Sequence, residues 1–140
     1  MAEQEILKVA GKAKTFTFSY YAALDSDTPE GRFQSLAILY VPQSVIEWNG
    51  HTSANCPSPH DFLQLMFQQM PPTKHHLITI DAHPLPGCED GDSFMISVTG
   101  KVSYNQEAAK LFCQTLIVRQ APGESKHYLV HDEFRWLAER

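Results

Sequence analysis

The hydrophobic periodicity of this chain changes at Pro71-Pro72, and that change limits the folds open to it. Before the two prolines, apolar residues recur every three or four positions, as they do along one face of a helix. After them, apolar and polar residues alternate in four segments, 77–85, 94–104, 111–119 and 128–137, as in β-strands. The links between these segments are short, so successive strands are expected to pair antiparallel. The pattern predicts an α+β fold.

Three helices are expected before the change of period. The first covers roughly residues 3–25, and the second stops at Pro42. The third opens at Ser58-Pro59, because serine is a favoured N-cap and proline is favoured at the first helical position. The side chains expected to face the core are Ile6, Val9, Ala10, Ala13, Phe16, Tyr20 and Leu24 in the first helix, Phe33, Leu36, Ala37 and Tyr40 in the second, and Phe62, Leu65, Met66 and Met70 in the third.

A short strand is expected between the second and third helices. It runs from Val45 to Trp48 and is followed at once by Asn49-Gly50. Asn-Gly supplies the two positive φ values that a type I′ turn requires, so the segment predicts a tight hairpin. Trp48 is therefore expected at the rim of the enclosed space, partly buried and close to Phe134.

Alternation divides the predicted sheet into two faces. The strongly apolar face is expected to pack against the helices, and it carries Phe94, Ile96, Val98, Val102, Tyr128, Val130, Phe134 and Trp136. The opposite face carries Thr79, Asp81, His83, Ser97, Thr99, Lys101, Gln114, His131 and Arg135, together with Leu77, Met95 and Leu129. A mixed face of this kind is either solvated or an interface with a partner, and the pattern leaves both interpretations open.

Length and charge exclude several classes of protein. The 140 residues are expected to form one domain, 1–140, and a net charge of -5 argues against direct binding of nucleic acid. No segment approaches the about 18 consecutive apolar residues of a membrane span, and the acidic N-terminus is unlike a secretory signal. These two features predict a soluble intracellular protein. The cysteines, three in number and without a CxxC motif, are expected to be reduced.

The pattern predicts no metal site, no cofactor and no catalytic residue. His75 and His76 are expected on opposite faces of one strand, and Cys113 is expected to be a core thiol. An isomerase or dehydratase that uses an enclosed pocket is the enzymatic alternative, with Asp132, Tyr20, Tyr40 and Tyr104 as its candidate acid–base groups. Against it, bulky rings are expected to fill the interior, and no titratable pair is expected to face it.

An ordered set of short motifs resembles the nuclear transport factor 2-like family. Together the motifs span about residues 16–137, and the family fold is a cone in which a strongly bent antiparallel sheet wraps around three helices. The matching segments are 18–25 (FSYYAALD), 36–40 (LAILY), 48–50 (WNG), 80–84 (IDAHP), 98–102 (VTGKV) and 132–135 (DEFR).

Within the family, Trp48-Asn49-Gly50 is similar to the branch that forms the small subunit of the heterodimeric mRNA export receptor. The resemblance implies a non-enzymatic protein of the nucleus and nuclear pore that shuttles to the cytoplasm. It implies pairing, sheet face to sheet face, with the large receptor subunit, and binding of phenylalanine-glycine nucleoporins through the heterodimer. The interface aspartate and arginine of the family correspond to Asp81 and Arg135. Thr79, Ser97, Thr99 and Gln114 are expected to lie beside them, and Trp48 and Phe134 to form the cavity rim.

The alternative within the family is a homodimer that carries GDP-bound Ran. The Ran-binding acidic residues of that branch lie in the link after the central strand. Here the link reads Tyr104-Asn105-Gln106-Glu107-Ala108, with a single glutamate and no aspartate, which argues against Ran binding. Residues 54–59 also depart from both branches, because the family usually has glycine before the third helix.

Overall fold

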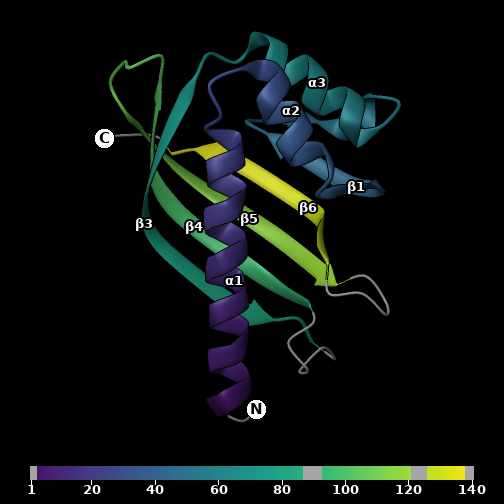
Figure 1. The fold of residues 1–140 in the computed structure, drawn as a ribbon, viewed down its shortest axis with the longest axis vertical. Helices are drawn as coiled ribbons and strands as arrows, with labels where there is room; N and C mark the ends of the chain where they lie inside the picture. Colours follow the sequence, from purple (N-terminus) through teal and green to yellow (C-terminus); the bar gives the residue numbers. More distant parts are fainter. Residues whose placement is uncertain (1–2, 87–92, 121–125, 138–140) are drawn as a thin grey trace.

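The structure, a computed structural model, describes residues 3–86, 93–120 and 126–137 (Figure 1). The elements follow the predicted order: α1 (Glu3–Leu24), α2 (Pro29–Ala37), β1 (Tyr40–Trp48), β2 (His51–Thr52), a short 3-10 helix (Ser53–Asn55), α3 (Pro59–Gln69), β3 (Thr73–Pro84), β4 (Ser93–Tyr104), β5 (Lys110–Gln120) and β6 (His127–Trp136). The α+β prediction is confirmed, and β3 to β6 pair antiparallel as expected.

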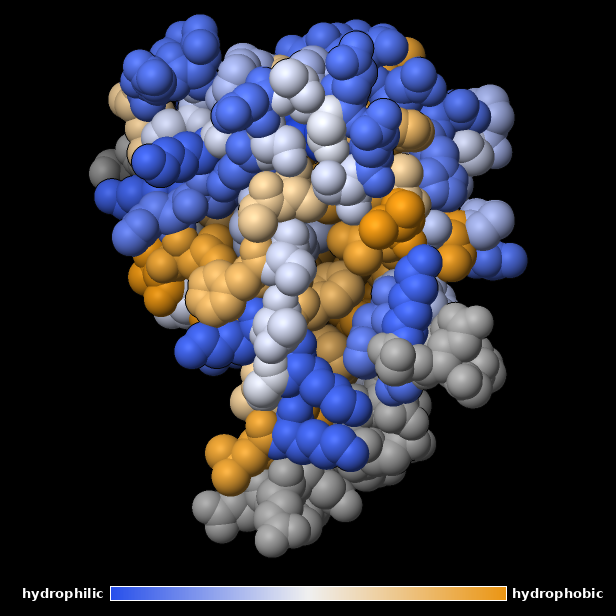
Figure 2. Space-filling model, viewed as in Figure 1, coloured by the Kyte–Doolittle hydropathy of each residue, from blue (hydrophilic) through white to orange (hydrophobic). Residues whose placement is uncertain are grey.

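The described strands form one curved sheet in the order β2-β1-β6-β5-β4-β3. β1 lies beside β6 and runs parallel to it, a pairing that the sequence pattern did not predict. α1 crosses the concave face, whereas α2 and α3 lie together over β1 at one end (Figure 1). Apolar surface is visible on both sides of α1 where it crosses the sheet (Figure 2). The arrangement is the predicted cone.

Helix α1 buries one stripe of side chains, including Val9, Ala13, Tyr20 and Leu24. Ile6 belongs to the same stripe by spacing but is 50% exposed, because the N-terminal turns of α1 extend past the strands (Figure 1). Ala10 is exposed as well. The expectation that Ile6 and Ala10 face the core is therefore wrong.

Helix α2 is shorter than expected. Thr28 caps its first turn by accepting a hydrogen bond from the Gly31 N–H at 3.0 Å, and Pro29 follows at the first helical position. The helix ends at Ala37, and Tyr40 begins β1 rather than continuing α2. Pro42, expected as a helix stop, lies where the β1–β6 pairing is interrupted, since proline has no N–H to donate to a ladder.

Helix α3 begins as predicted. The Ser58 hydroxyl accepts a hydrogen bond from the Asp61 N–H at 3.2 Å, and Pro59 occupies the first turn. Its buried face differs by one position from the expected one: Phe62, Leu63 and Phe67 are buried, whereas Leu65 is 55% exposed. The expected inward position of Leu65 is wrong.

Two bulges reverse the strand alternation. Ile78 is an extra residue in β3 opposite β4, and Val130 is an extra residue in β6 opposite β5. A bulge shifts the side-chain parity by one residue, so Leu77 and Leu129 point to the core instead of the outer face. Tyr128 and Val130, expected in the core, are only half-buried. Neither bulge carries glycine or another clear sequence signal.

Candidate functional site

Two rows of side chains cross the outer, convex face of the sheet. The first row follows the register Thr79–Thr99–Cys113–Arg135 across β3, β4, β5 and β6. The second row, beside it, is Asp81–Ser97–Thr115–Glu133. Five of the six residues predicted for a partner surface lie in these rows. These five residues are far apart in the sequence, and strand pairing within the sheet brings them into one patch.

The two rows are polar along most of their length, with one charge at the β3 end and two at the β6 end. The hydroxyl oxygens of Thr79 and Thr99 lie 2.5 Å apart, so one donates to the other across the β3–β4 pair. Asp81 is exposed at the β3 end. At the β6 end, the Arg135 side chain is 62% exposed, and its Nη2 lies 3.6 Å from the Glu133 Oε1. An exposed pair of this kind contributes at most about 1 kcal/mol, so the guanidinium is available to a second carboxylate.

Three residues of the rows were missed by sequence reasoning: Cys113, Thr115 and Glu133. Cys113 is half-buried on the outer face, so the expectation of a core thiol is wrong. Its neighbours Phe112 and Gln114 are the inward residues of β5. Phe112, Leu116 and Val118 are buried, so the odd-numbered residues of β5 face outward. The apolar side chains at these even positions are the sequence signal that could have placed the odd-numbered residues on the outer face.

Gln114 lies inside the cone, so its predicted place on the outer face is wrong. It is fully buried and pairs in register with Val98, an inward residue of β4. Its Nε2 donates to the Tyr20 hydroxyl at 2.8 Å and to the Asp132 Oδ1 at 2.6 Å, while its Oε1 accepts from the Tyr21 hydroxyl. Gln114 therefore belongs to a buried polar cluster.

The centre of that cluster is the Asp132 carboxylate, which is fully buried. Its Oδ2 accepts hydrogen bonds from the Tyr20 hydroxyl at 2.8 Å and the Tyr40 hydroxyl at 2.5 Å. Burial raises the pKa of Asp132, and the hydrogen bonds from Tyr40, Gln114 and Tyr20 act in the opposite direction. Burial and the nearby carboxylate raise the pKa of both Tyr20 and Tyr40 well above the ordinary value.

The cluster bears on the enzymatic alternative. The expectation that no titratable pair faces the interior is wrong, because an acid with a raised pKa meets two tyrosines there. The carboxylate has no exposed surface, however, and the donors already occupy its oxygens. A substrate would have to displace Tyr20, Tyr40 or Gln114. Tyr104, the fourth candidate, is not among the hydrogen-bond donors to Asp132. Its hydroxyl accepts a hydrogen bond from the Trp136 Nε1 at 3.0 Å.

A second, partly buried polar cluster joins the residue after α1 to β3. The Asp25 carboxylate accepts from the His75 Nδ1–H at 2.5 Å, the His75 backbone N–H at 2.9 Å and the Thr73 hydroxyl at 2.8 Å. The His75 ring is enclosed by Tyr21, Phe112 and Phe134, whereas His76 is exposed. The expectation that the two histidines face opposite sides is confirmed.

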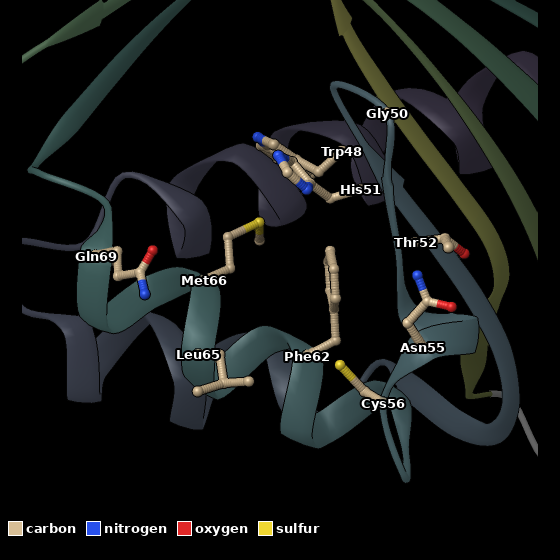
Figure 3. Close-up of a pocket in the computed structure, with 10 residues that line it drawn as sticks. All are labelled: Trp48, Gly50, His51, Thr52, Asn55, Cys56, Phe62, Leu65, Met66 and Gln69. Carbon is tan, nitrogen blue, oxygen red and sulfur yellow. The ribbon is translucent and has the colours of Figure 1, made fainter.

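Trp48 and Phe134 meet at the mouth of the cone, as predicted. Trp48 is more deeply buried than expected and forms one wall of a pocket of about 380 Å³ between α3 and the β1–β2 hairpin. Figure 3 shows Phe62 and Met66 projecting from α3 toward Trp48 and His51. A neighbouring pocket of about 520 Å³ shares Trp48 and Met66 and extends to Tyr104 and Trp136.

Within the described ranges, no three His, Cys, Asp or Glu side chains gather closely enough to hold a metal ion. In the same residues, no helix combines the length and apolar character of a membrane span. Cys88 lies outside the described residues.

Comparison with known proteins identifies the family. The model of the nuclear transport factor 2 (NTF2) domain matches residues 12–136, nearly the whole chain. The chain belongs to the NTF2 family. An NTF2-related export protein of Caenorhabditis elegans is 27% identical over 141 residues, which cover 96% of this chain and 95% of that protein.

Solved NTF2-family structures share the fold. Nuclear transport factor 2 of Cryptosporidium parvum superposes with a TM-score of 0.74 at 20% identity, over 93% of this chain and 95% of that one. A chain of the Candida albicans complex of Mtr2 with the Mex67 M domain superposes with a TM-score of 0.73 at 18% identity, over 91% of this chain and 94% of that one. At these identities the likeness defines the NTF2 fold alone.

Proposed function

We propose that this NTF2-family chain is the small, non-enzymatic subunit of a heterodimeric mRNA export receptor. The observation that carries the proposal is the pair of polar rows on the outer sheet face, with Asp81 at one end and Arg135 at the other. The similarity to an NTF2-related export protein over nearly the full length supports it. The partner is the NTF2-like domain of the large receptor subunit, which packs its own sheet on these rows.

The chemistry of the outer face suits a sheet partner. Met95, Leu111 and Ile117 are half-buried apolar side chains on the same face, so the patch combines apolar area with fixed hydroxyls. A covering sheet would remove water from Asp81 and Arg135, and each charge would then need an opposite charge on the partner. The neighbouring Glu133 satisfies Arg135 only in part, at 3.6 Å.

The proposal includes the cellular role. The heterodimer binds phenylalanine-glycine nucleoporins and moves between the nucleus, the nuclear pore and the cytoplasm. RNA is bound by the large subunit, since this chain carries a net charge of -5. No cofactor or catalytic residue takes part.

The test is co-purification of charge-reversed variants with the large export-receptor subunit. Asp81→Arg and Arg135→Asp should each weaken the heterodimer at least tenfold, because an unpaired buried charge at an interface costs about 2–5 kcal/mol. Reversing the facing charge on the partner should restore part of the binding. The matched controls are Asp27→Arg and Lys8→Asp, exposed charges on other surfaces. Unchanged co-purification of both outer-face variants would show that another surface forms the interface.

A homodimer that carries GDP-bound Ran is the second candidate. It is favoured by the stacked Trp48 and Phe134, which correspond to the cavity rim of that branch. The link after β4 weakens it: Asn105 and Gln106 form a tight turn with positive φ angles, and Glu107 is the single acid beside them. A stable homodimer in light scattering, together with retention of GDP-bound Ran, would favour this candidate over the export subunit.

A further inference from the structure

Strand β3 forms an open edge of the sheet. In the described part of the chain, β4 is its single strand neighbour, so the backbone groups on its other side face no strand. Near its start, the His75 N–H is bonded to the Asp25 carboxylate of the α1 C-terminus, which covers the edge there. Farther along, α1 packs against β3, with Ala10, Lys14 and Phe18 beside it. An open edge is a template for another strand.

The bulge limits the usable length of this edge. Regular pairing with β4 is interrupted at Ile78 and resumes at Thr79. Pro84, at the end of β3, has no N–H to donate. The regular open edge therefore runs from Thr79 to His83, which matches an extended segment of about five residues.

A groove lies beside this edge, between α1 and β3. It has a volume of about 400 Å³ and is lined by Ala10, Lys14, Phe18, Leu77, Ile78, Ile80 and Ala82. Phe18 and Ile78 are 51% and 55% exposed, although both are large and apolar. Figure 2 shows this apolar surface over β3, beside the middle of α1. A strand added at the edge would direct alternate side chains into the groove.

The charged side chain of the groove is Lys14. Its Nζ lies 5.9 Å from the centroid of the Phe18 ring, so the cation is held over the apolar floor. Among the described residues that line the groove, none is acidic. An occupant with an acidic residue at this point would meet an opposite charge.

We propose that the α1–β3 groove binds an extended segment of a partner protein as an added strand. The segment has small apolar residues at alternate positions and one acidic residue beside Lys14. The groove opens on the concave side and edge of the sheet, whereas the polar rows of the proposed heterodimer lie on the convex face. The two proposals use different parts of β3: the groove uses its concave-side side chains and its backbone edge, whereas the rows use the convex-side side chains of Thr79 and Asp81. This proposal does not depend on the proposed function.

The probe is a fluorescent nine-residue peptide in which valine occupies alternate positions and glutamate replaces the central valine, so that all of these side chains face the groove. Its binding to the full chain is measured by anisotropy. The matched control is the same peptide with alternate backbone amides N-methylated. It keeps every side chain and cannot donate the hydrogen bonds of an added strand. We expect N-methylation to weaken binding about tenfold. The Leu85 N–H bonds to Ser93 of β4, so the N–H groups that face the open edge are those of Ile80 and Ala82. Amide-resolved hydrogen exchange should slow at these two residues when the unmodified peptide is bound.

Two pairs of variants locate the site. Ile78→Lys should abolish binding, whereas Ile38→Lys, which changes a similarly exposed isoleucine just after α2, should not. Lys14→Glu should weaken binding of the glutamate peptide about fivefold and improve binding of a matching lysine peptide, while Lys8→Glu should change neither. Equal binding of the N-methylated peptide, protection around Trp48 in place of β3, or an Ile78-dependent homodimer in light scattering would each overturn the proposal.

Discussion

The indole ring of Trp48 lies flat on the phenyl ring of Phe134, with centroids 4.2 Å apart and planes 8° from parallel. The two residues meet because β1 and β6 run parallel and pair in register at this position. Phe134 stacks in turn on Phe112 of β5, with centroids 5.1 Å apart. One column of rings therefore joins three strands near the mouth of the cone, beside the hairpin at Asn49.

The first prediction concerns this column. Phe134→Ala should lower the free energy of unfolding by about 3–5 kcal/mol, because it removes a buried ring that two others contact. Urea denaturation measures the change. Phe18→Ala is the matched control and should cost about 1 kcal/mol or less, since half of that side chain is already exposed. Similar losses in the two variants would show that the column does not stabilise the fold.

The second prediction concerns two glycines. Gly50 follows Asn49 in the hairpin, and both have positive φ, at 89° and 50°. Gly50→Ala should destabilise the protein by about 1 kcal/mol, because alanine is strained in that conformation. Gly11→Ala should stabilise it by a similar amount, because Gly11 lies in α1 and an added Cβ meets no atom within 4 Å. Thermal unfolding of both variants should therefore shift Tm in opposite directions.

The third prediction concerns the pH dependence of Asp132. The pKa of Asp132 is raised above 3.8 in the folded protein, so the native state binds more protons than the unfolded state between about pH 4 and that raised pKa. The stability that this group contributes is present at low pH and is lost as the pH rises through the folded pKa. The difference in unfolding free energy between wild type and Asp132→Asn should therefore fall as the pH increases from 4 to 8. Tyr40→Phe retains the carboxylate and should retain the trend.

The fourth prediction separates the two faces of β5. Gln114→Ala should destabilise the monomer by about 1–3 kcal/mol, because Tyr20, Tyr21 and Asp132 each lose a buried hydrogen-bond partner. Cys113→Ser changes the adjacent, outward residue and should alter stability by less than about 1 kcal/mol. Chemical denaturation of the two variants tests this directly. The reverse order of effects would contradict the assignment of the faces.

The fifth prediction concerns RNA. The purified chain should bind single-stranded RNA more weakly than about 10 μM at physiological salt, because its net charge is -5. Fluorescence anisotropy with a labelled oligonucleotide measures this. Submicromolar binding would contradict the expectation and would assign an RNA contact to this subunit.

The order of elements could be predicted because it depends on local chemistry. Ser58-Pro59 specifies the start of α3, and Asn49-Gly50 specifies the hairpin after Trp48, each through short-range backbone preferences. The alternation in β4 placed Ser97 and Thr99 on the outer face, and both lie there. Asp81 and Arg135 are also outward, although whether they contact a partner is a prediction still to be tested.

The sequence by itself determined the elements, their order and most of the residues on the outer face. These depend on apolar spacings of two and 3.6 residues, which are set by side chains close together in the chain. Tertiary structure decided the rest. The bulges at Ile78 and Val130 place Leu77 and Leu129 on the core side, since one extra residue gives the side chains before it the opposite parity from those after it. The parallel pairing of β1 with β6 brought Tyr40 to Asp132, and the cone then enclosed Gln114 with them. These contacts join residues far apart in the chain, and their free energy exists only once the sheet has closed around α1.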